Sequence, residues 1–151
     1  MLPVKTVLHP TDLSAASREA FGLACRIARD RGARVVALHV VPRLSQRSAE
    51  VVIGDPLARL REVAPDIAID TRIESGDPAG VILRTAAETE CDLIVMGTRG
   101  RTGLNRSRIN HVSHEVVERA TCPVLTMRYS SPDDGWPTDD VSDRTAPFWQ
   151  V

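Results

Sequence analysis

The sequence predicts an α/β fold: a single doubly wound domain in which a five-stranded parallel sheet carries helices on both faces. Three observations support this fold class. The chain has 151 residues, which is about the length of one domain. Hydrophobic residues make up 42% of the chain, enough for a packed core. Short β-branched segments alternate with segments of helical periodicity, an order typical of parallel strands joined by crossover helices.

The first strand and the first helix are predicted from the segment before Gly32. Residues 4–9 are short, apolar and followed by a proline, which is typical of a buried strand. Asp12 or Ser14 can cap the helix that follows, because both side chains accept hydrogen bonds from free backbone amides. Apolar residues recur at a helical period from position 16 onwards, and Gly32 favours the left-handed turn that ends a helix.

The middle of the chain predicts two strands and a short helix. Residues 34–41 are almost continuously apolar and form the second predicted strand. A modest helix is expected near residues 55–63, ended by a proline. Residues 67–74 alternate apolar and polar side chains, which indicates a strand with one solvated face near a sheet edge.

The remaining elements complete a β-α-β-α-β-α-β-α-β order. Pro78 at a first helical position and Asp77 as the cap before it predict a third helix. Residues 92–96 form a continuous apolar strand of the kind that is buried on both faces. A final helix over about 111–120 and a final strand over 123–128 follow.

The position of a binding site follows from this topology. The two most apolar strands, 4–9 and 92–96, are expected at the centre of the sheet. Ligands of such sheets bind beyond the carboxyl ends of the strands, where the strand order reverses. If these two strands are neighbours, residues 10–14 and 97–111 build the site.

The loop predicted over residues 97–109 is rich in glycine, hydroxyl and arginine side chains. Glycines allow close backbone approach, and consecutive amides before a helix favour an anion. One interpretation is a phosphate cradle, and the other is an ordinary turn with a solvated basic loop. The residues that suggest the cradle are Gly97, Gly100, Gly103, Thr98, Thr102, Ser113, Arg99, Arg101, Arg106 and Arg108.

Five sequence blocks together resemble the universal stress protein family, in the order of that family and over residues 3–128. They are the segments 10–14, 38–41, 76–79, 92–104 and 122–125. The resemblance implies a Rossmann-like five-stranded sheet with the strand order 3-2-1-4-5. It also implies ATP binding, which many members show, and dimerisation through the last strand.

The ATP motif of the family is matched in its first half. The motif is Gly, two residues, Gly, nine residues, Gly and then Ser or Thr. Gly97 and Gly100 match it, whereas Asn110 and His111 stand where the family has Gly-Ser. Asn110 is a good N-cap, so its amide oxygen would compete with a phosphate for helix amides. The nucleotide-binding residues that the resemblance implies are Pro10, Thr11, Asp12, Val41, Met96, Gly97, Thr98, Arg99, Gly100, Asn110, His111, Val112 and Ser113.

Two functions follow from the resemblance, and a third is disfavoured. The first is a stress-response regulator that binds ATP, with Mg as a further cofactor. The second is a nucleotide-free homodimeric interaction protein, which the change at Asn110 and His111 favours. Its dimer would form through the apolar last strand, at Val124, Leu125 and Met127, because an unpaired edge invites a second chain. A hydrolase or transferase is disfavoured, since the sequence shows no nucleophile or metal-ligand motif, and no catalytic or metal-binding residue is predicted.

Charge and apolar patterning exclude other classes. The net charge of −1 argues against a nucleic-acid binder. No apolar run approaches the length of roughly 18 residues that a membrane-spanning helix needs. The N-terminus lacks the pattern of a signal peptide, and three scattered cysteines without a close pair suit a reducing compartment. A cytoplasmic protein is therefore expected.

The C-terminal segment differs from the rest of the chain. Residues 129–151 carry five aspartates and one arginine, a net charge of −4, and four of the five aromatic residues. The preceding 128 residues carry +3. The expected organisation is a basic α/β domain over 1–128 and an acidic, aromatic tail over 129–151. The tail either anchors on a surface or is a loosely ordered terminus.

Overall fold

The computed structural model describes residues 3–41, 55–99 and 106–129, and within them it confirms the α/β fold. The chain alternates strand and helix from β1 to β5. The tail from residue 130 and the predicted loop over 42–48 lie outside the described residues. The elements are β1 Thr6–Pro10, α1 Ala15–Arg31, β2 Arg34–Val41, α2 Ala58–Val63, β3 Ile69–Ser75, α3 Pro78–Glu88, β4 Leu93–Arg99, α4 Arg106–Arg119 and β5 Val124–Tyr129.

The five strands form one parallel sheet with the order β3-β2-β1-β4-β5, as predicted. β1 lies at the centre and pairs with β2 on one side and with β4 on the other. The strand order therefore reverses between β1 and β4. β3 and β5 are the edges of the sheet, which confirms the edge position expected for the alternating strand and for the last strand.

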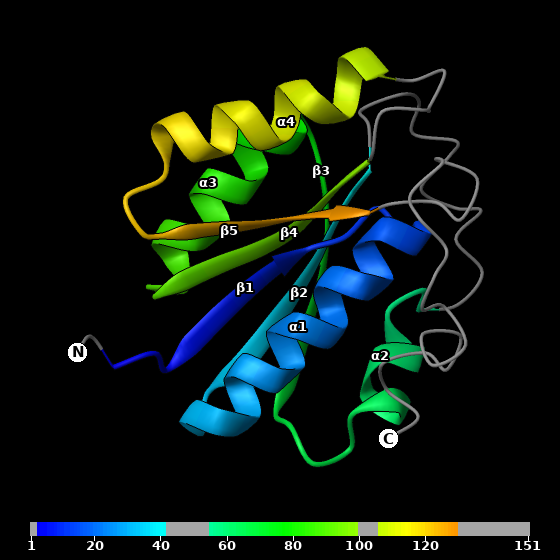
Figure 1. The fold of residues 1–151 in the computed structure, drawn as a ribbon, viewed down its shortest axis with the longest axis vertical. Helices are drawn as coiled ribbons and strands as arrows, with labels where there is room; N and C mark the ends of the chain where they lie inside the picture. The colour runs from blue at the N-terminus through cyan, green and yellow to red at the C-terminus, as the bar shows by residue number, and fades with distance from the viewer. Residues whose placement is uncertain (1–2, 42–54, 100–105, 130–151) are drawn as a thin grey trace, which may run out of the picture.

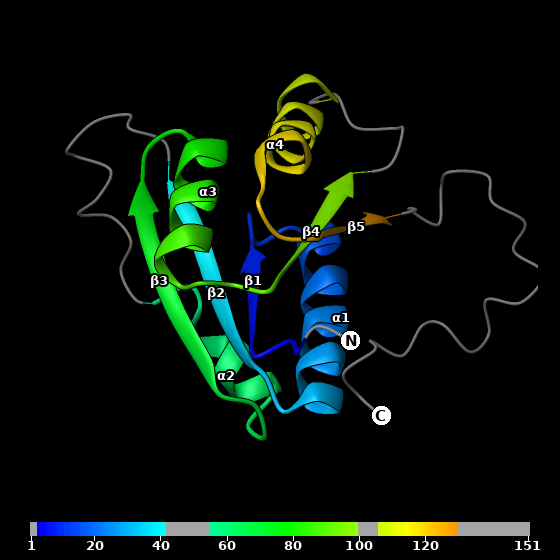
Figure 2. The same ribbon diagram turned by 90° about the vertical axis from the view of Figure 1, so that its left-hand side faces the viewer.

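Helices cover both faces of the sheet (Figure 1). α1 and α2 lie on one face, and α3 and α4 lie on the other. The view in Figure 2 separates α3 from α1, with the central strands between them. Two apolar clusters fill the spaces between the layers, one on each face.

The predicted helix ends are confirmed at three positions. Ser14 caps α1 and accepts a hydrogen bond from the Ser17 amide, so the choice between Asp12 and Ser14 falls on Ser14. Gly32 ends α1 with φ +64°, a conformation that glycine adopts at little cost. Asp77 caps α3, and its carboxylate accepts from the Gly80 amide at 2.9 Å.

Several predicted boundaries are wrong, among them the starts of β1 and α2, which are Thr6 and Ala58 instead of residues 4 and 55. β4 continues to Arg99 instead of ending before Gly97, because its last three residues pair with β5. α4 begins at Arg106, so Asn110 lies inside the helix and does not cap it. β3 begins at Ile69, two residues later than predicted, where its pairing with Val35 starts. The later end of β4 and the earlier start of α4 shorten the loop that the sequence suggested as a phosphate cradle.

In the described part of the chain, no helix has both the length and the apolar character needed to cross a membrane.

Candidate functional site

A cavity of about 220 Å³ lies beyond the carboxyl ends of β1, β2 and β4, on the side of the sheet that α3 and α4 cover. β1 and β4 are the neighbours between which the strand order reverses. The cavity therefore lies where the topology predicted a binding site. The residues that line it are Pro10, Thr11, Asp12, Ser17, Leu38, Val40, Pro78, Ile82, Met96, Gly97 and Val112.

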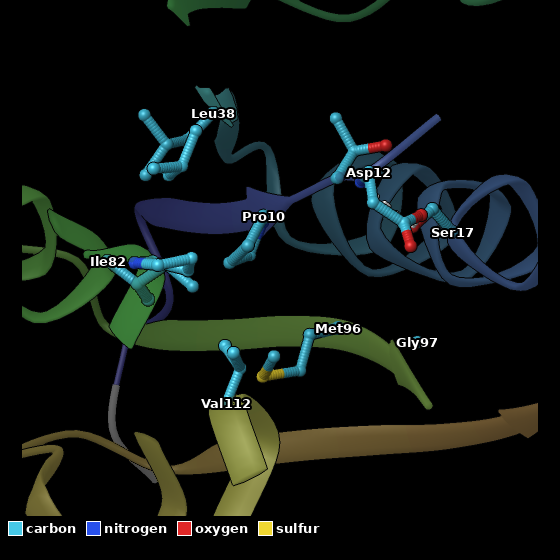
Figure 3. Close-up of a pocket in the computed structure, with 11 residues that line it drawn as sticks. Pro10, Asp12, Ser17, Leu38, Ile82, Met96, Gly97 and Val112 are labelled. Atoms are coloured by element: carbon cyan, nitrogen blue, oxygen red, sulfur yellow. Dashed lines mark hydrogen bonds between the residues drawn. The ribbon is translucent and has the colours of Figure 1, made fainter. Parts of the chain in front are cut away.

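The larger part of the cavity wall is apolar, and it comes from five separate elements. Leu38 and Met96 come from β2 and β4, the strands on either side of β1, while Ile82 and Val112 approach from α3 and α4 (Figure 3). Leu38, Ile82 and Met96 are buried. Such a wall suits a flat apolar ring. The cavity volume of about 220 Å³ is below the range of about 300–1,000 Å³ that is typical of pockets for drug-sized ligands. The cavity thus matches one ring system and its attachment better than a whole nucleotide.

One end of the cavity is polar, and its carboxylate is held in place (Figure 3). Asp12 Oδ1 accepts a hydrogen bond from Ser17 Oγ at 2.6 Å and another from the Ser14 amide at 2.9 Å. The Asp12 amide in turn donates to Ser17 Oγ at 3.2 Å. Among the described residues that line the cavity, Asp12 has the one charged side chain. This end therefore offers a fixed acceptor of the kind that orients hydroxyl groups.

The turn between β1 and α1 is fixed from both sides. The Thr11 amide donates to the Leu38 carbonyl at 2.8 Å, and the Thr11 carbonyl faces His39 Nδ1 at 2.9 Å. Thr11 Oγ1 accepts from the Leu13 amide at 3.0 Å. Leu13 has φ +65°, which is uncommon for a residue other than glycine and is often found at binding sites. These bonds keep the backbone of Thr11 and Asp12 at the cavity mouth.

Gly97 is required by packing at this edge of the sheet. A Cβ at position 97 would lie 2.6 Å from the Ala16 carbonyl oxygen and 3.2 Å from the Ser17 amide. Both are backbone atoms at the start of α1, so neither moves aside easily. The glycine that the sequence suggested for approach to a ligand is thus needed for the approach of β4 to α1.

His9 of β1 and His39 of β2 both make hydrogen bonds within the fold. His9 Nδ1 lies 2.9 Å from the Val95 carbonyl oxygen, and its ring packs against Phe21. Burial of the imidazole lowers the pKa of His9 from 6.5 to about 4. His9 is therefore neutral at pH 7, with Nδ1 as the donor and a buried Nε2 that has no hydrogen-bond partner among the described residues.

The structure brings together six of the residues predicted for the site. They are Pro10, Thr11, Asp12, Met96, Gly97 and Val112.

Other predicted residues lie away from the lining. Val41 ends β2, and Val40 lines the cavity instead. Thr98 Oγ1 donates to the Met127 carbonyl at 3.4 Å. His111 is exposed on α4, and Ser113 is buried within it.

The predicted phosphate end is not described by the structure. Gly100 lies outside the described residues, as do the predicted cradle residues Arg101, Thr102 and Gly103. The side chains of Arg99, Arg106, Arg108 and Asn110 are not described either, although these residues belong to β4 and α4. The phosphate cradle stays a prediction.

Five lining residues were missed by sequence reasoning: Ser17, Leu38, Val40, Pro78 and Ile82. A signal for two of them was present, because Leu38 and Val40 are alternate residues of a predicted strand and must share a face. Ile82 lies four residues after the predicted first residue of a helix, but nothing in the sequence showed that this helix starts beside the cavity. Only the packing of α3 against β2 reveals that.

No group of three or more histidine, cysteine or acidic side chains is arranged to hold a metal among the described residues.

Comparisons with known proteins agree with the geometry. The family model of the universal stress protein family matches residues 3–128. A universal stress protein of Methanocaldococcus jannaschii is 34% identical over 139 residues, which cover 82% of each chain.

Two solved structures share the fold. A universal stress protein in complex with cAMP has a TM-score of 0.68 and 23% identity, covering 85% of this chain and all of that one. The universal stress protein of Archaeoglobus fulgidus in complex with dAMP has a TM-score of 0.63 and 20% identity, covering 83% of this chain and 98% of that one.

Proposed function

The chain belongs to the universal stress protein family, and on this premise we propose that it binds an adenine nucleotide and acts as a stress-response regulator without dedicated catalysis. The adenine and ribose occupy the cavity beyond β1 and β4. The apolar wall takes the adenine ring, and the Asp12 end faces the ribose.

The observation that carries this proposal is the division of the cavity into an apolar and a polar part. Leu38, Ile82, Met96 and Val112 form a wall for a base, and Asp12 is fixed by two hydrogen bonds at the other end. A carboxylate held in this way accepts hydrogen bonds from sugar hydroxyls without a further ordering cost. The cavity volume fits a nucleoside better than a triphosphate.

The ligands of two structural neighbours support the same class of ligand. One neighbour is a complex with cAMP and the other a complex with dAMP. Both ligands contain adenine, a sugar and one phosphate. In the proposed complex of this chain, the phosphates leave the cavity past Gly97 toward the arginines that follow β4 in the sequence. ATP, with Mg on its phosphates, is therefore a ligand to test beside AMP.

A calorimetric titration with ATP, AMP and adenosine tests the proposal. We expect all three to bind, because the cavity holds the part that they share. If AMP and ATP bind more tightly than adenosine, the difference measures how strongly the segment after β4 binds phosphates. Guanosine at the same concentrations is the control for recognition of the base. If adenosine, AMP and ATP all fail to bind, the proposed function is wrong. If adenosine binds as tightly as ATP, that segment does not grip phosphates.

A second function, a nucleotide-free dimeric interaction protein, is favoured by the exposed edge at β5. Leu125 on this edge strand is 38% exposed, and large apolar side chains at an unpaired edge favour a second chain. Native mass spectrometry of the full chain reports both dimer mass and any co-purified nucleotide. A dimer without nucleotide that Leu125→Arg dissociates, and that the matched change Val63→Arg on α2 leaves intact, would favour this function.

A further inference from the structure

Two cysteine thiols lie together at the end of the sheet opposite the cavity. Cys91 lies two residues before β4, and Cys122 lies two residues before β5. Their Sγ atoms are 3.5 Å apart. The residues are separated by 31 positions in the sequence, so the spacing of the cysteines along the chain gave no sign of this contact.

Strand pairing brings the two thiols together. β4 and β5 run in parallel with Ile94 opposite Val124, and the Ile94 amide donates to the Pro123 carbonyl at 3.0 Å. Each cysteine stands just before one of these paired strands. The juxtaposition therefore follows from the sheet and does not depend on the placement of a long side chain.

The two thiols differ in exposure. Cys91 is buried, whereas Cys122 is partly exposed. Burial raises the pKa of the Cys91 thiol well above its usual range, so Cys91 is protonated at pH 7. An oxidant arriving from water thus meets Cys122 first, with Cys91 directly behind it.

We propose that Cys91 and Cys122 are an oxidative modification site, in which hydrogen peroxide oxidises the two thiols to a reversible intramolecular disulfide. The Cys122 thiolate attacks the O–O bond of the hydroperoxide; an S–O bond forms, the O–O bond breaks, and hydroxide leaves and takes up a proton. The Cys91 thiol then attacks the resulting sulfenic acid and passes its proton to the departing hydroxyl group; the S–S bond forms, the S–O bond breaks, and water is lost. The two thiols lose two electrons and two protons, and hydrogen peroxide is reduced to two waters.

The disulfide would join the beginnings of β4 and β5 and close a loop that includes all of α4. Three residues of the cavity lining, Met96, Gly97 and Val112, lie within this loop. Closing a loop of this length restricts the unfolded chain, so the oxidised protein is more resistant to unfolding. We expect its Tm to rise by roughly 5–10 °C.

Intact-mass measurement of the full chain, treated with hydrogen peroxide after complete reduction, tests this proposal. The expected result is a monomer lighter by about 2 Da, restored by dithiothreitol. Peptide mapping should show the Cys91 and Cys122 peptides joined. Cys91→Ser and Cys122→Ser should each abolish the loss of mass, and Cys25→Ser is the matched control that should retain it.

Three outcomes would overturn the proposal. They are oxygen added to Cys122 without any disulfide, a disulfide between two chains, and a disulfide that includes Cys25. The peptide map of the oxidised wild-type chain distinguishes these outcomes even if a serine variant fails to fold. Equal Tm values for the reduced and oxidised forms would remove the proposed stabilisation.

Discussion

The two faces of the sheet are packed with side chains of different size. Under α1, the buried cluster is rich in alanine, and backbone atoms of α1 and β4 approach closely at Gly97. Under α3 and α4, larger aliphatic side chains dominate the cluster. Small residues on the first face are Ala20, Ala24, Ala28, Ala33, Ala37 and Ala64, and large ones on the second are Leu8, Leu38, Val81, Ile82, Ile94, Met96 and Val116.

This difference separates stability from binding. Small side chains let α1 lie close to the sheet, so an added atom there meets backbone. Larger side chains on the other face leave a cavity where α3 and α4 pass beyond the strands. Changes on the α1 face should therefore reduce stability, whereas changes at the cavity end of the other face should mainly reduce binding.

The largest effect is expected from His9, which is enclosed on the α1 face. Its pKa is lowered to about 4 in the folded state from 6.5, so the unfolded chain binds more protons between these values. The stability from neutral His9 is complete above pH 6.5 and is lost as the pH falls toward 4. About 3 kcal/mol of the free energy of unfolding should depend on it. Urea unfolding from pH 7.5 to pH 4 measures this loss.

His9→Asn keeps a donor near the Val95 carbonyl and removes the titrating ring. The variant should show a pH dependence smaller by this amount, with His114→Asn on exposed α4 as the control for loss of a histidine. Identical pH profiles for His9→Asn and the unmodified chain would contradict the prediction.

Gly97→Ala tests the close approach of β4 to α1. The added Cβ would meet the Ala16 carbonyl oxygen at 2.6 Å, and backbone must shift to relieve the contact. We expect a loss of about 2–3 kcal/mol in the free energy of unfolding, measured in urea. Gly32→Ala is the matched control, because it adds the same methyl group in open space. Its only cost is the left-handed backbone at φ +64°, about 1 kcal/mol of the free energy of unfolding. Equal losses in both variants would show that the contact at Gly97 relaxes freely.

Val112→Trp tests the cavity face. The larger ring fills space beside Ile82 and Met96, so adenosine affinity should fall by at least tenfold, or about 1.4 kcal/mol, in a calorimetric titration. The Tm should change less than the affinity because Val112 is only partly buried against the core cluster under α3 and α4. Val117→Trp places the same ring on the exposed side of α4, where Val117 is 52% exposed, and should bind adenosine normally. Loss of binding in both variants would point to α4 as a whole and not to the cavity.

Ser17→Ala tests the point where the two faces meet. The hydroxyl donates to Asp12 Oδ1 at 2.6 Å and accepts from the Asp12 amide. Its removal should cost about 1 kcal/mol in the free energy of unfolding and weaken adenosine binding several-fold, because Asp12 loses its support. Ser75→Ala, at the exposed end of β3, is the control. Unchanged adenosine affinity would remove Asp12 from the proposed site.

Much of the fold was predictable because local chemistry specifies it. The cap at Asp77, the choice of Asp12 or Ser14 for the cap of α1, the glycine that ends α1 and the alternation of strand and helix were readable from neighbouring residues. The boundaries of β4 and α4 were predicted wrongly, because pairing with β5 extends β4 through Gly97. A glycine within a strand predicts a loop when the partner strand and the helix packed against it are not known from the sequence.

The sequence by itself determined the family, the fold class, the strand order that the family implies, and the half of the site that follows β1 and β4. These properties depend on local pattern and on motifs along the chain. The tertiary structure alone decided that Leu38, Val40 and Ile82 share a cavity, that Gly97 serves the packing of α1, and that Cys91 and Cys122 touch. Each of these depends on contacts between segments far apart in sequence, and their distances are set by the packing of whole elements.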